Sequence, residues 1–236
     1  MGDELRFTKG HGTENDFVLV ADPDGELDLS PATVAALCDR RAGIGGDGLI
    51  RVVRSKALAE GEDSLAEDES AEWFMDYRNA DGSLAEMCGN GVRVFAAYLQ
   101  DRGLIDSALL GSTEGLVIGT RAGVRRVRHA VGPAGEPGWF SVDMGRWRLP
   151  GGPAAVSDGF DAEVLVAGLG AVARPGLSVD LGNPHTVVAL PDGAELDAAD
   201  LLSAPAVQPV PRDGTNVELI VMEPPTGSEG RLRMRV

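Results

Sequence analysis

The sequence predicts an α+β fold of two domains whose strands are mostly antiparallel. Short apolar runs with strand-like alternation recur along the 236 residues, and most are bounded by glycine, proline or asparagine. Only a few stretches have the spacing of an amphipathic helix. The character also changes after Gly103, because strand-like runs then dominate and helical patterns weaken. A chain of this length is enough for one large domain or two modest ones.

The first half combines helices with strands. Ser30 followed by Pro31 predicts a helix start, since serine caps a helix and proline suits its first position. Residues 57–72 are acidic and small, which favours a solvated excursion. The expected elements are strands at Leu5–Thr8, Asp16–Val20, Leu49–Arg54 and Trp73–Arg78, with a polar loop at 10–15, a helix from Ser30 to about Arg41 and a glycine-rich turn at 43–48.

The second half reads as a series of short strands. The glycine- and proline-rich run 132–138 is the best boundary candidate, which predicts domains of residues 1–132 and 133–236. One weak helix is expected at Ala198–Ser203. The expected strands are Leu116–Thr120, Val124–His129, Trp139–Met144, Gly176–Leu181, Thr186–Leu190, Val217–Met222 and Leu232–Val236.

Cys88 lies where a polar loop is expected to become a helix. Apolar residues follow at Val92, Phe95, Ala96 and Leu99, which is one face of a helix, and Gly103 is a plausible stop. Cys88 and the amides of Gly89, Asn90 and Gly91 would then lie at the positive end of that helix. This position predicts a lowered pKa for the thiol and an amide cradle for a carboxylate. The alternative is a small buried hydrophobe, and the local sequence leaves both interpretations open.

Other polar residues give weaker signals. Cys38 falls on the apolar face of its helix and is expected to be inert core. The turn Asn183-Pro184-His185 precedes a strand, and His185 could be a base, an orienting group or an ordinary loop residue. The glycine-rich run 43–48 lacks the ending of a phosphate loop. No cysteine and histidine spacing matches a zinc site, and no motif indicates a cofactor, so neither a metal nor a cofactor is expected.

Charge and composition restrict the partners. The net charge of −16 argues against nucleic acid and anionic membrane surfaces, which need clustered positive charge. No apolar run approaches the length of a membrane span, and no leader peptide is recognised at the start of the sequence. Two cysteines are too few for a disulfide scaffold, so a reducing, cytoplasmic location is expected. A small acidic molecule remains a suitable substrate, because an amide nest can hold it.

Six runs, taken together, resemble the diaminopimelate epimerase family. They occur in the family's order and span nearly the whole chain. A weak internal echo, Asn15 before one strand and Asn183 before another, fits the two-lobed symmetry of that family. The six runs are His11–Phe17, Gly43–Leu49, Tyr77–Ser83, Met87–Gly91, Gly182–His185 and Gly214–Glu218.

The resemblance implies a fold, a reaction and a set of site residues. The fold would be two similar lobes, each a mostly antiparallel sheet or barrel around a central helix. The activity would be the cofactor-independent interconversion of LL- and meso-diaminopimelate, in lysine and peptidoglycan precursor biosynthesis, by a thiolate and a thiol acting at the α-carbon. Cys88 would be catalytic with His185 assisting, and a homodimer is possible. Substrate would be bound by Asn15, Asn79, Gly89, Asn90, Asn183 and Asn216.

The resemblance also has departures. Family members can carry glutamine where Gly48 stands, so recognition of the distal end of the substrate is expected to differ. The family's second cysteine segment would follow Val236, so the second lobe is expected to be incomplete and the chain by itself to have little epimerase activity. Three alternatives follow: an amino-acid-binding remnant of the family, a related racemase or dehydratase that needs one thiol, and a Cys88–His185 hydrolase. The hydrolase would leave the four asparagines unexplained.

Overall fold

The computed structural model describes residues 5–132, 135–212, 214–227 and 229–236. The chain forms two compact units, Met1–Gly145 and Arg146–Val236. The division comes later than the boundary expected after residue 132, because the strand β7 (Trp139–Asp143) pairs with β6 (Arg125–Ala130) and so belongs to the first sheet. Residues 133 and 134 of the glycine- and proline-rich run lie outside the described residues.

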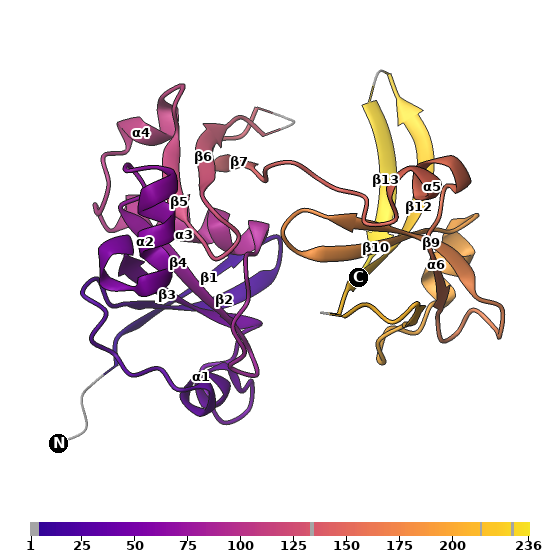
Figure 1. Cartoon of the computed structure of the whole chain (residues 1–236), viewed down its shortest axis with the longest axis horizontal. Coiled ribbons are helices and arrows are strands. Elements are labelled where there is room, and N and C mark those ends of the chain that lie inside the picture. The colour runs from indigo at the N-terminus through magenta and orange to yellow at the C-terminus, as the bar shows by residue number, and fades with distance from the viewer. Residues whose placement is uncertain (1–4, 133–134, 213, 228) are drawn as a thin grey trace. The chain divides into compact units, whose positions relative to one another are not determined.

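The first unit is built on one sheet of seven strands in chain order, β1 to β7 (Figure 1). The pairs β2–β3 and β4–β5 are parallel and the other four are antiparallel. Each parallel pair is joined by a helical crossover, as parallel strands require. The remaining bounds are β1 Phe7–Gly12, β2 Asn15–Ala21, β3 Gly48–Arg54, β4 Trp73–Asn79 and β5 Leu116–Gly119.

Helix α3 (Gly89–Asp101) is the central helix of this unit. It contacts β1 to β4 and also β6 and β7, so the sheet curls around it. The expected apolar face is confirmed, because Val92, Phe95, Ala96 and Leu99 are all buried. Gly103 follows in the left-handed region, with φ of 63°, as a helix stop requires. The largest hydrophobic cluster of the first unit lies between this helix and the sheet.

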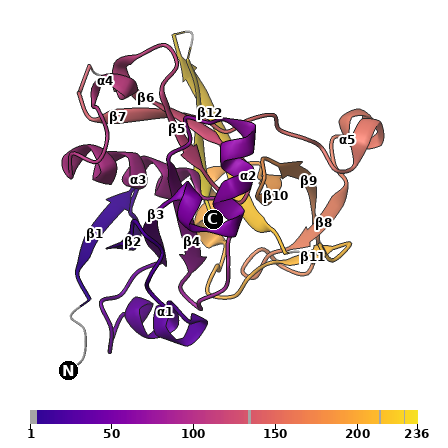
Figure 2. The same cartoon turned by 60° about the vertical axis from the view of Figure 1, so that its left-hand side comes forward.

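The other face of the sheet is covered by helix α1 (Pro31–Cys38), which Figures 1 and 2 show on the opposite side of β2 and β3 from α3. Strand β2 is therefore buried on both faces: Phe17 and Leu19 join the α3 cluster, whereas Val18 and Val20 join the α1 cluster. This explains the uninterrupted apolar run in the sequence. Ser30 caps α1 through the amide of Thr33, as predicted, but the helix ends at Cys38 and not at Arg41.

Two predictions for the first unit are wrong. Residues 57–72 are not a simple solvated excursion, because they contain α2 (Ala59–Glu67) after the 3-10 turn η1 (Ser55–Ala57). Helix α2 buries only Gly61 and Ser64, so it lacks the apolar stripe that would have revealed it. The loop expected at 10–15 is mostly strand, and the turn itself is Thr13 and Glu14, both with positive φ. A short helix, α4 (Ala108–Gly111), completes the unit.

The second unit is a sheet of six strands in the order β11-β8-β9-β10-β12-β13. Only the β10–β12 pair is parallel among the pairs that the described residues form in this sheet. The prediction of a helix at Ala198–Ser203 is wrong, because the helix in this region, α6, spans Gly193–Ala198 and is capped by the side chain of Asp192. Strands β8 and β11 and helix α5 were not predicted. The bounds are α5 Gly152–Asp158, β8 Ala162–Leu165, β9 Arg174–Asp180, β10 Pro184–Ala189, β11 Ala206–Gln208, β12 Asn216–Thr226 and β13 Glu229–Arg235.

The two sheets repeat one topology. In the first unit β1–β2 is antiparallel, β2–β3 parallel and β3–β4 antiparallel. In the second unit β9–β10, β10–β12 and β12–β13 follow the same sequence of pairings. Asn15 begins β2, and Asn183 immediately precedes the equivalent strand β10. The internal echo in the sequence therefore corresponds to equivalent strands of two similar α+β lobes.

None of the helices that the structure describes is both long and apolar enough to cross a membrane.

Candidate functional site

Cys88 is the N-cap residue of α3. Its backbone is extended, with φ of −143° and ψ of 118°, and its Sγ accepts a hydrogen bond from the amide of Gly91 at 3.5 Å. The first amides of a helix have no acceptor within the helix, and they carry the positive end of its dipole. The amides of Gly89 and Asn90 are thus placed beside the thiol, in the geometry expected of a carboxylate cradle.

The pKa of Cys88 differs from the sequence-based prediction. Burial of the thiol raises its pKa above the ordinary value, and this outweighs the lowering by the amides of Gly91 and Asn90 and by the charge of Arg93. Asp47 adds a smaller effect that also raises the pKa. The prediction of a lowered pKa from helix position alone was wrong, because the sequence does not show that the sulfur packs against the hydrophobic cluster of α3.

Asn15 is in contact with Cys88, although the two are far apart in the sequence. The Sγ of Cys88 lies 3.5 Å from Oδ1 of Asn15. The other end of the same amide, Nδ2, donates to Oδ2 of Asp47 at 2.6 Å. Asp47 also accepts from Arg40 at 2.7 Å through its other oxygen. Asp47, in the turn before β3, is thus linked to Cys88 through the side chain of Asn15.

Arg93 fixes the first turn of α3 from its outer side. Its guanidinium donates to the carbonyl of Gly89 at 3.3 Å and to Oγ1 of Thr13 at 2.9 Å, and it also binds the side chain of Asn90. The side chain of Asn90 is therefore engaged, while its backbone amide remains at the helix start. A fixed positive charge beside the helix terminus favours an anion there.

Asn79 lies at the end of β4, opposite Gly48 of β3. Its amide nitrogen and its side chain Nδ2 both donate to Ser83, the latter at 3.0 Å to Oγ. Asp81 accepts from the Ser83 hydroxyl at 2.6 Å, so the turn 79–83 is held by its own polar groups. No contact between Asn79 and Cys88 is among the hydrogen bonds of the described residues.

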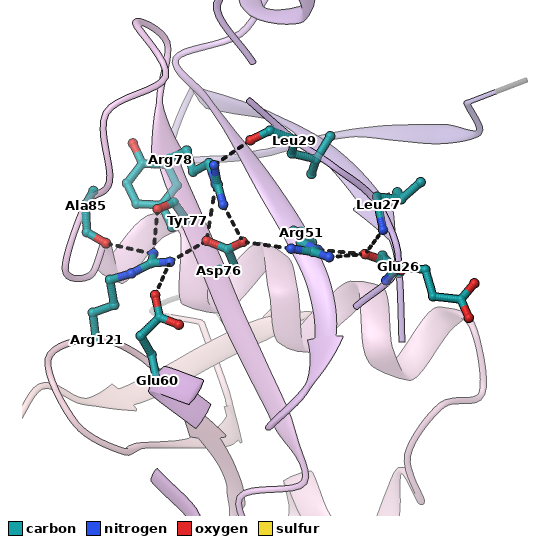
Figure 3. Close-up of polar contacts among 11 residues, drawn as sticks. Glu26, Leu27, Leu29, Arg51, Glu60, Asp76, Tyr77, Arg78, Ala85 and Arg121 are labelled. Atoms are coloured by element: carbon teal, nitrogen blue, oxygen red, sulfur yellow. Dashed lines mark hydrogen bonds and ion pairs between the residues drawn. The ribbon is translucent and has the colours of Figure 1, made fainter. Parts of the chain in front are cut away.

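A buried ion network supports the segment that leads to Cys88 (Figure 3). Asp76 on β4 is fully buried and binds Arg121 at 2.6 Å and Arg78 at 3.2 Å. Arg121 also donates to the carbonyls of Tyr77 and Ala85, at 3.1 and 3.5 Å. One guanidinium therefore joins the end of β4 to the residues just before Met87 and Cys88.

The second unit brings His185 and Asn216 together. They are register partners on the parallel strands β10 and β12, and Nδ2 of Asn216 donates to the carbonyl of Pro184 at 3.3 Å. Asn183 lies directly before β10 and is half-buried. A cavity of about 440 Å³ borders this region, and its lining includes Asp180, Pro184, His185, Thr186, Arg212 and Thr215.

His185 has an acidic partner. Its Nδ1 lies 2.5 Å from Oε1 of Glu218, and both side chains are largely buried. This hydrogen bond raises the pKa of His185, against the lowering effect of burial. The other oxygen of Glu218 is buried without a partner among the described residues. The acidic partner thus favours the protonated imidazole, relative to a histidine that lacks such a partner.

Apart from Asn79, which is held in its own turn, the expected residues therefore occupy two groups, one in each unit. Asn15, Cys88, Gly89 and Asn90 lie together at the start of α3, and Asn183, His185 and Asn216 lie at the start of β10 and β12. Cys38 is 3% exposed in the cluster of α1, where burial raises its pKa. Among the described residues, no group of three or more histidines, cysteines or acids could hold a metal ion.

Sequence reasoning did not identify three of the polar residues at these sites: Asp47, Arg93 and Glu218. Asp47 lies within the glycine-rich run that contributed to the family resemblance, but no role was given to its carboxylate. Arg93 follows Gly89 by one helical turn, a spacing that could have indicated its contact with the helix start. Glu218 lies two residues after Asn216, which in a strand places both on one face. Its pairing with His185 depends on the parallel neighbours β10 and β12, which the sequence does not specify.

The comparisons with known proteins identify one family. A family model described as diaminopimelate epimerase matches residues 7–148. The diaminopimelate epimerase of Streptomyces coelicolor is 51% identical over 225 residues, which cover 94% of this chain and 68% of the relative. That of Thermobifida fusca is 53% identical over 204 residues, covering 82% and 70%.

Solved structures share the fold at low identity. A phenazine biosynthesis protein of the PhzF family from Bacillus anthracis superimposes with a TM-score of 0.57 at 16% identity, covering 97% of this chain and 70% of that one. A hydroxyproline epimerase from Agrobacterium vitis, solved with trans-4-hydroxy-L-proline bound, gives 0.54 at 12% identity, covering 98% and 69%. At these identities the likeness concerns the fold alone, and it agrees with the expected α+β lobes.

Proposed function

The chain belongs to the diaminopimelate epimerase family, a family of isomerases, and on that premise we propose that Cys88 transfers the proton at an α-carbon of diaminopimelate. The observation that carries the proposal is the position of the thiol: Cys88 caps α3 directly beside the amides of Gly89 and Asn90. The reaction interconverts the LL and meso forms, as the sequence resemblance implies, and serves lysine and peptidoglycan precursor biosynthesis.

The first chemical step moves one proton from carbon to sulfur. The Cys88 thiolate takes the α-proton, and the electron pair of the broken C–H bond passes into the adjacent carboxylate, which becomes enediolate-like. Delivery of a proton from a second acid to the opposite face of the carbon inverts the centre. The family resemblance implies a second thiol in that role. A thiol with a raised pKa is a stronger base once it is ionised, which suits removal of a weakly acidic proton.

The start of α3 supplies stabilisation where charge develops. Because the carboxylate gains negative charge as the α-proton leaves, amides that point at it bind the transition state more tightly than the ground state. Gly89 and Asn90 offer such amides, and Arg93 adds a positive charge fixed to the carbonyl of Gly89. These features suit a reaction at an α-carboxylate, where negative charge develops.

The asparagines would bind the rest of the substrate. An amide side chain offers both donor and acceptor atoms without a net charge, so it can bind both the ammonium and the carboxylate groups of diaminopimelate. Asn15 lies against Cys88. Asn79, Asn183 and Asn216 each end or begin a strand, where side chains are available to a ligand. His185, held by Glu218, is proposed to assist as a charged donor.

The test is exchange of the α-proton of LL-diaminopimelate for solvent deuterium, followed by proton NMR. Signal loss accumulates over hours, so the assay detects slow turnover. We expect Cys88→Ala to reduce the exchange rate by about 10²-fold or more, which is the usual contribution of a general acid or base. Cys38→Ala is the matched control and should exchange like the parent protein, because Cys38 is packed in the core of α1.

Two outcomes would contradict the assignment. Equal exchange by the parent protein and the Cys88→Ala variant would show that another group moves the proton. The second contradicting outcome combines two measurements: the parent protein exchanges no α-proton, and added diaminopimelate does not slow the alkylation of Cys88. Together they would show that this site does not bind the substrate.

The proposed setting is the cytoplasm, without a membrane or nucleic acid partner. Cys38 and Cys88 are both free thiols, which supports a reducing compartment. The net charge of −16 supports a small-molecule substrate rather than nucleic acid. A homodimer stays a prediction from the resemblance, and sedimentation velocity would test it.

A further inference from the structure

Asp47, Asn15 and Cys88 form a chain of polar contacts that the proposed mechanism does not use. Oδ2 of Asp47 accepts from Nδ2 of Asn15 at 2.6 Å and from the backbone amide of Asp16 at 3.0 Å. Oδ1 of Asn15 lies 3.5 Å from Sγ of Cys88. Arg40 binds the second oxygen of Asp47 at 2.7 Å, which holds the carboxylate in place.

The carboxylate determines which way the Asn15 amide points. An ionised carboxylate can only accept hydrogen bonds, so it selects the NH₂ end of a neighbouring amide. The carbonyl end of Asn15 must then face Cys88. A carbonyl oxygen accepts from a protonated thiol, but it offers a thiolate no hydrogen bond and repels it. Rotation of the amide would give the thiolate a donor at the cost of the bond to Asp47.

The other groups around the sulfur have opposite effects on the stability of the Cys88 thiolate. Arg93 from α3 and the amides of Asn90 and Gly91 favour the thiolate, whereas Asp47 disfavours it. Burial holds the pKa of Tyr77 of β4 well above its ordinary value, so its hydroxyl is uncharged near neutral pH. Asp47 is therefore an acidic side chain whose charge raises the pKa of Cys88 directly, and Asn15 gives it a second, indirect route.

We propose that Asp47 is a positioning residue that fixes the amide of Asn15 with its carbonyl toward Cys88, and thereby keeps the proton on the sulfur until a ligand engages Asn15. The inference rests on the proposed function, since it concerns the same thiol. It assigns a role to the glycine-rich run 43–48: that run presents one carboxylate to the amide beside the catalytic candidate.

The test measures the rate of alkylation of Cys88 by iodoacetamide as a function of pH, in a Cys38→Ala background that leaves one thiol. Asp47→Asn removes the charge and allows the Asn15 amide to turn. We expect the midpoint of the pH profile to fall by about one pH unit. At a fixed pH below the midpoint, the thiolate fraction and hence the alkylation rate then rise roughly tenfold. Asp47→Glu keeps a carboxylate and should restore much of the parent profile.

A double-mutant cycle separates positioning from charge alone. Asn15→Ala removes the acceptor without adding apolar bulk against the sulfur, and should by itself lower the midpoint. If Asp47 acts through Asn15, adding Asp47→Asn to Asn15→Ala should shift the midpoint by much less than it does in the parent. Asp24→Asn removes an exposed charge of the same unit and is the control, expected to leave the profile unchanged.

Two results would overturn the inference. The first is a midpoint in folded Asp47→Asn that equals or exceeds that of the parent protein. The second is a shift of the midpoint by Asp47→Asn that is equally large whether or not Asn15 is present. Should Asp47→Asn not fold, a midpoint in Asn15→Ala that is equal to or above that of the parent would also refute it. Alkylation needs neither substrate nor turnover. Failure of the deuterium-exchange test would therefore refute the proposed function while leaving this measurement interpretable.

Discussion

Arg121 is bound to Asp76 at 2.6 Å and at the same time to the carbonyl of Tyr77, so one side chain neutralises a fully buried carboxylate and connects the end of β4 to the residues before Cys88 (Figure 3). Arg51 and Arg78 complete the surroundings of Asp76. Such a network holds backbone in place only as long as its charges remain balanced.

Removal of Arg121 should therefore destabilise the first unit. For Arg121→Ala we expect a loss of about 3 kcal/mol in the free energy of unfolding, the lower end for a broken buried pair, since Arg51 and Arg78 still face Asp76. Denaturant titration followed by tryptophan fluorescence measures it. Glu72→Ala, which breaks an exposed contact to Arg54 at 3.7 Å, should cost less than about 1 kcal/mol. Equal losses in the two variants would contradict the argument.

The His185–Glu218 pair predicts a pH dependence in the second unit. Since the hydrogen bond to Glu218 raises the pKa of His185, the pair stabilises the folded state fully below the unfolded pKa of about 6.5, and this stabilisation disappears as pH rises through the folded pKa. We expect Glu218→Gln to lower the NMR titration midpoint of the His185 ring, because the lowering effect of burial is then opposed only by the smaller raising effect of Asp180. Glu163→Gln, an exposed glutamate of β8, should leave the midpoint in place. A midpoint unaffected by Glu218→Gln would refute the pairing.

Gly48 should tolerate no side chain. A Cβ atom at this position would lie 2.4 Å from the carbonyl oxygen of Arg78 and 2.5 Å from Cε2 of Tyr77. Gly48→Ala and Gly48→Gln should both lower the free energy of unfolding by about 1–3 kcal/mol, the usual cost of overpacking. Gly111→Ala is the control and should cost less, because no atom lies within 4 Å of a Cβ at that position. Thermal unfolding measures the difference. Wild-type stability in Gly48→Gln would show that the strand shifts to accept the side chain.

The central position of α3 predicts a large cost for loss of its core contacts. Phe95 is fully buried between the helix and the sheet, so Phe95→Ala should lower the free energy of unfolding by about 3–5 kcal/mol. Asp101→Ala at the exposed end of the same helix should change it by less than about 0.5 kcal/mol. A small loss for Phe95→Ala would mean that the sheet does not close around this helix.

Periodicity was sufficient for the elements that bury a regular face. The helix that begins near Cys88 and strands such as Trp73–Arg78, observed as Trp73–Asn79, were predicted because their apolar residues recur at 3.6 or 2 positions or form a continuous buried run. Helix α2 and the short strands β8 and β11 were missed because each buries few residues. Local pattern carries little information about such elements, whose stability comes from tertiary contacts.

Several residues of the site could be predicted from the sequence, whereas the pKa shift of the thiol and the ion pairing around it could not. The run around Cys88 identified the thiol and the helix start, since both are local. The direction of the pKa shift was not local, because it depends on burial by residues from other strands and on Asp47, far away in the sequence. Glu218 was missed for the same reason: its partner His185 lies on a neighbouring strand.

Because the sulfur of Cys88 is also the N-cap of α3, an electrophile that alkylates it takes away the hydrogen-bond acceptor of Gly91 in the same event. A covalent inhibitor directed at this thiol would thus loosen the first helical turn together with the amides of Gly89 and Asn90. Hydrogen exchange at those amides would then report inhibitor occupancy without any measurement of turnover.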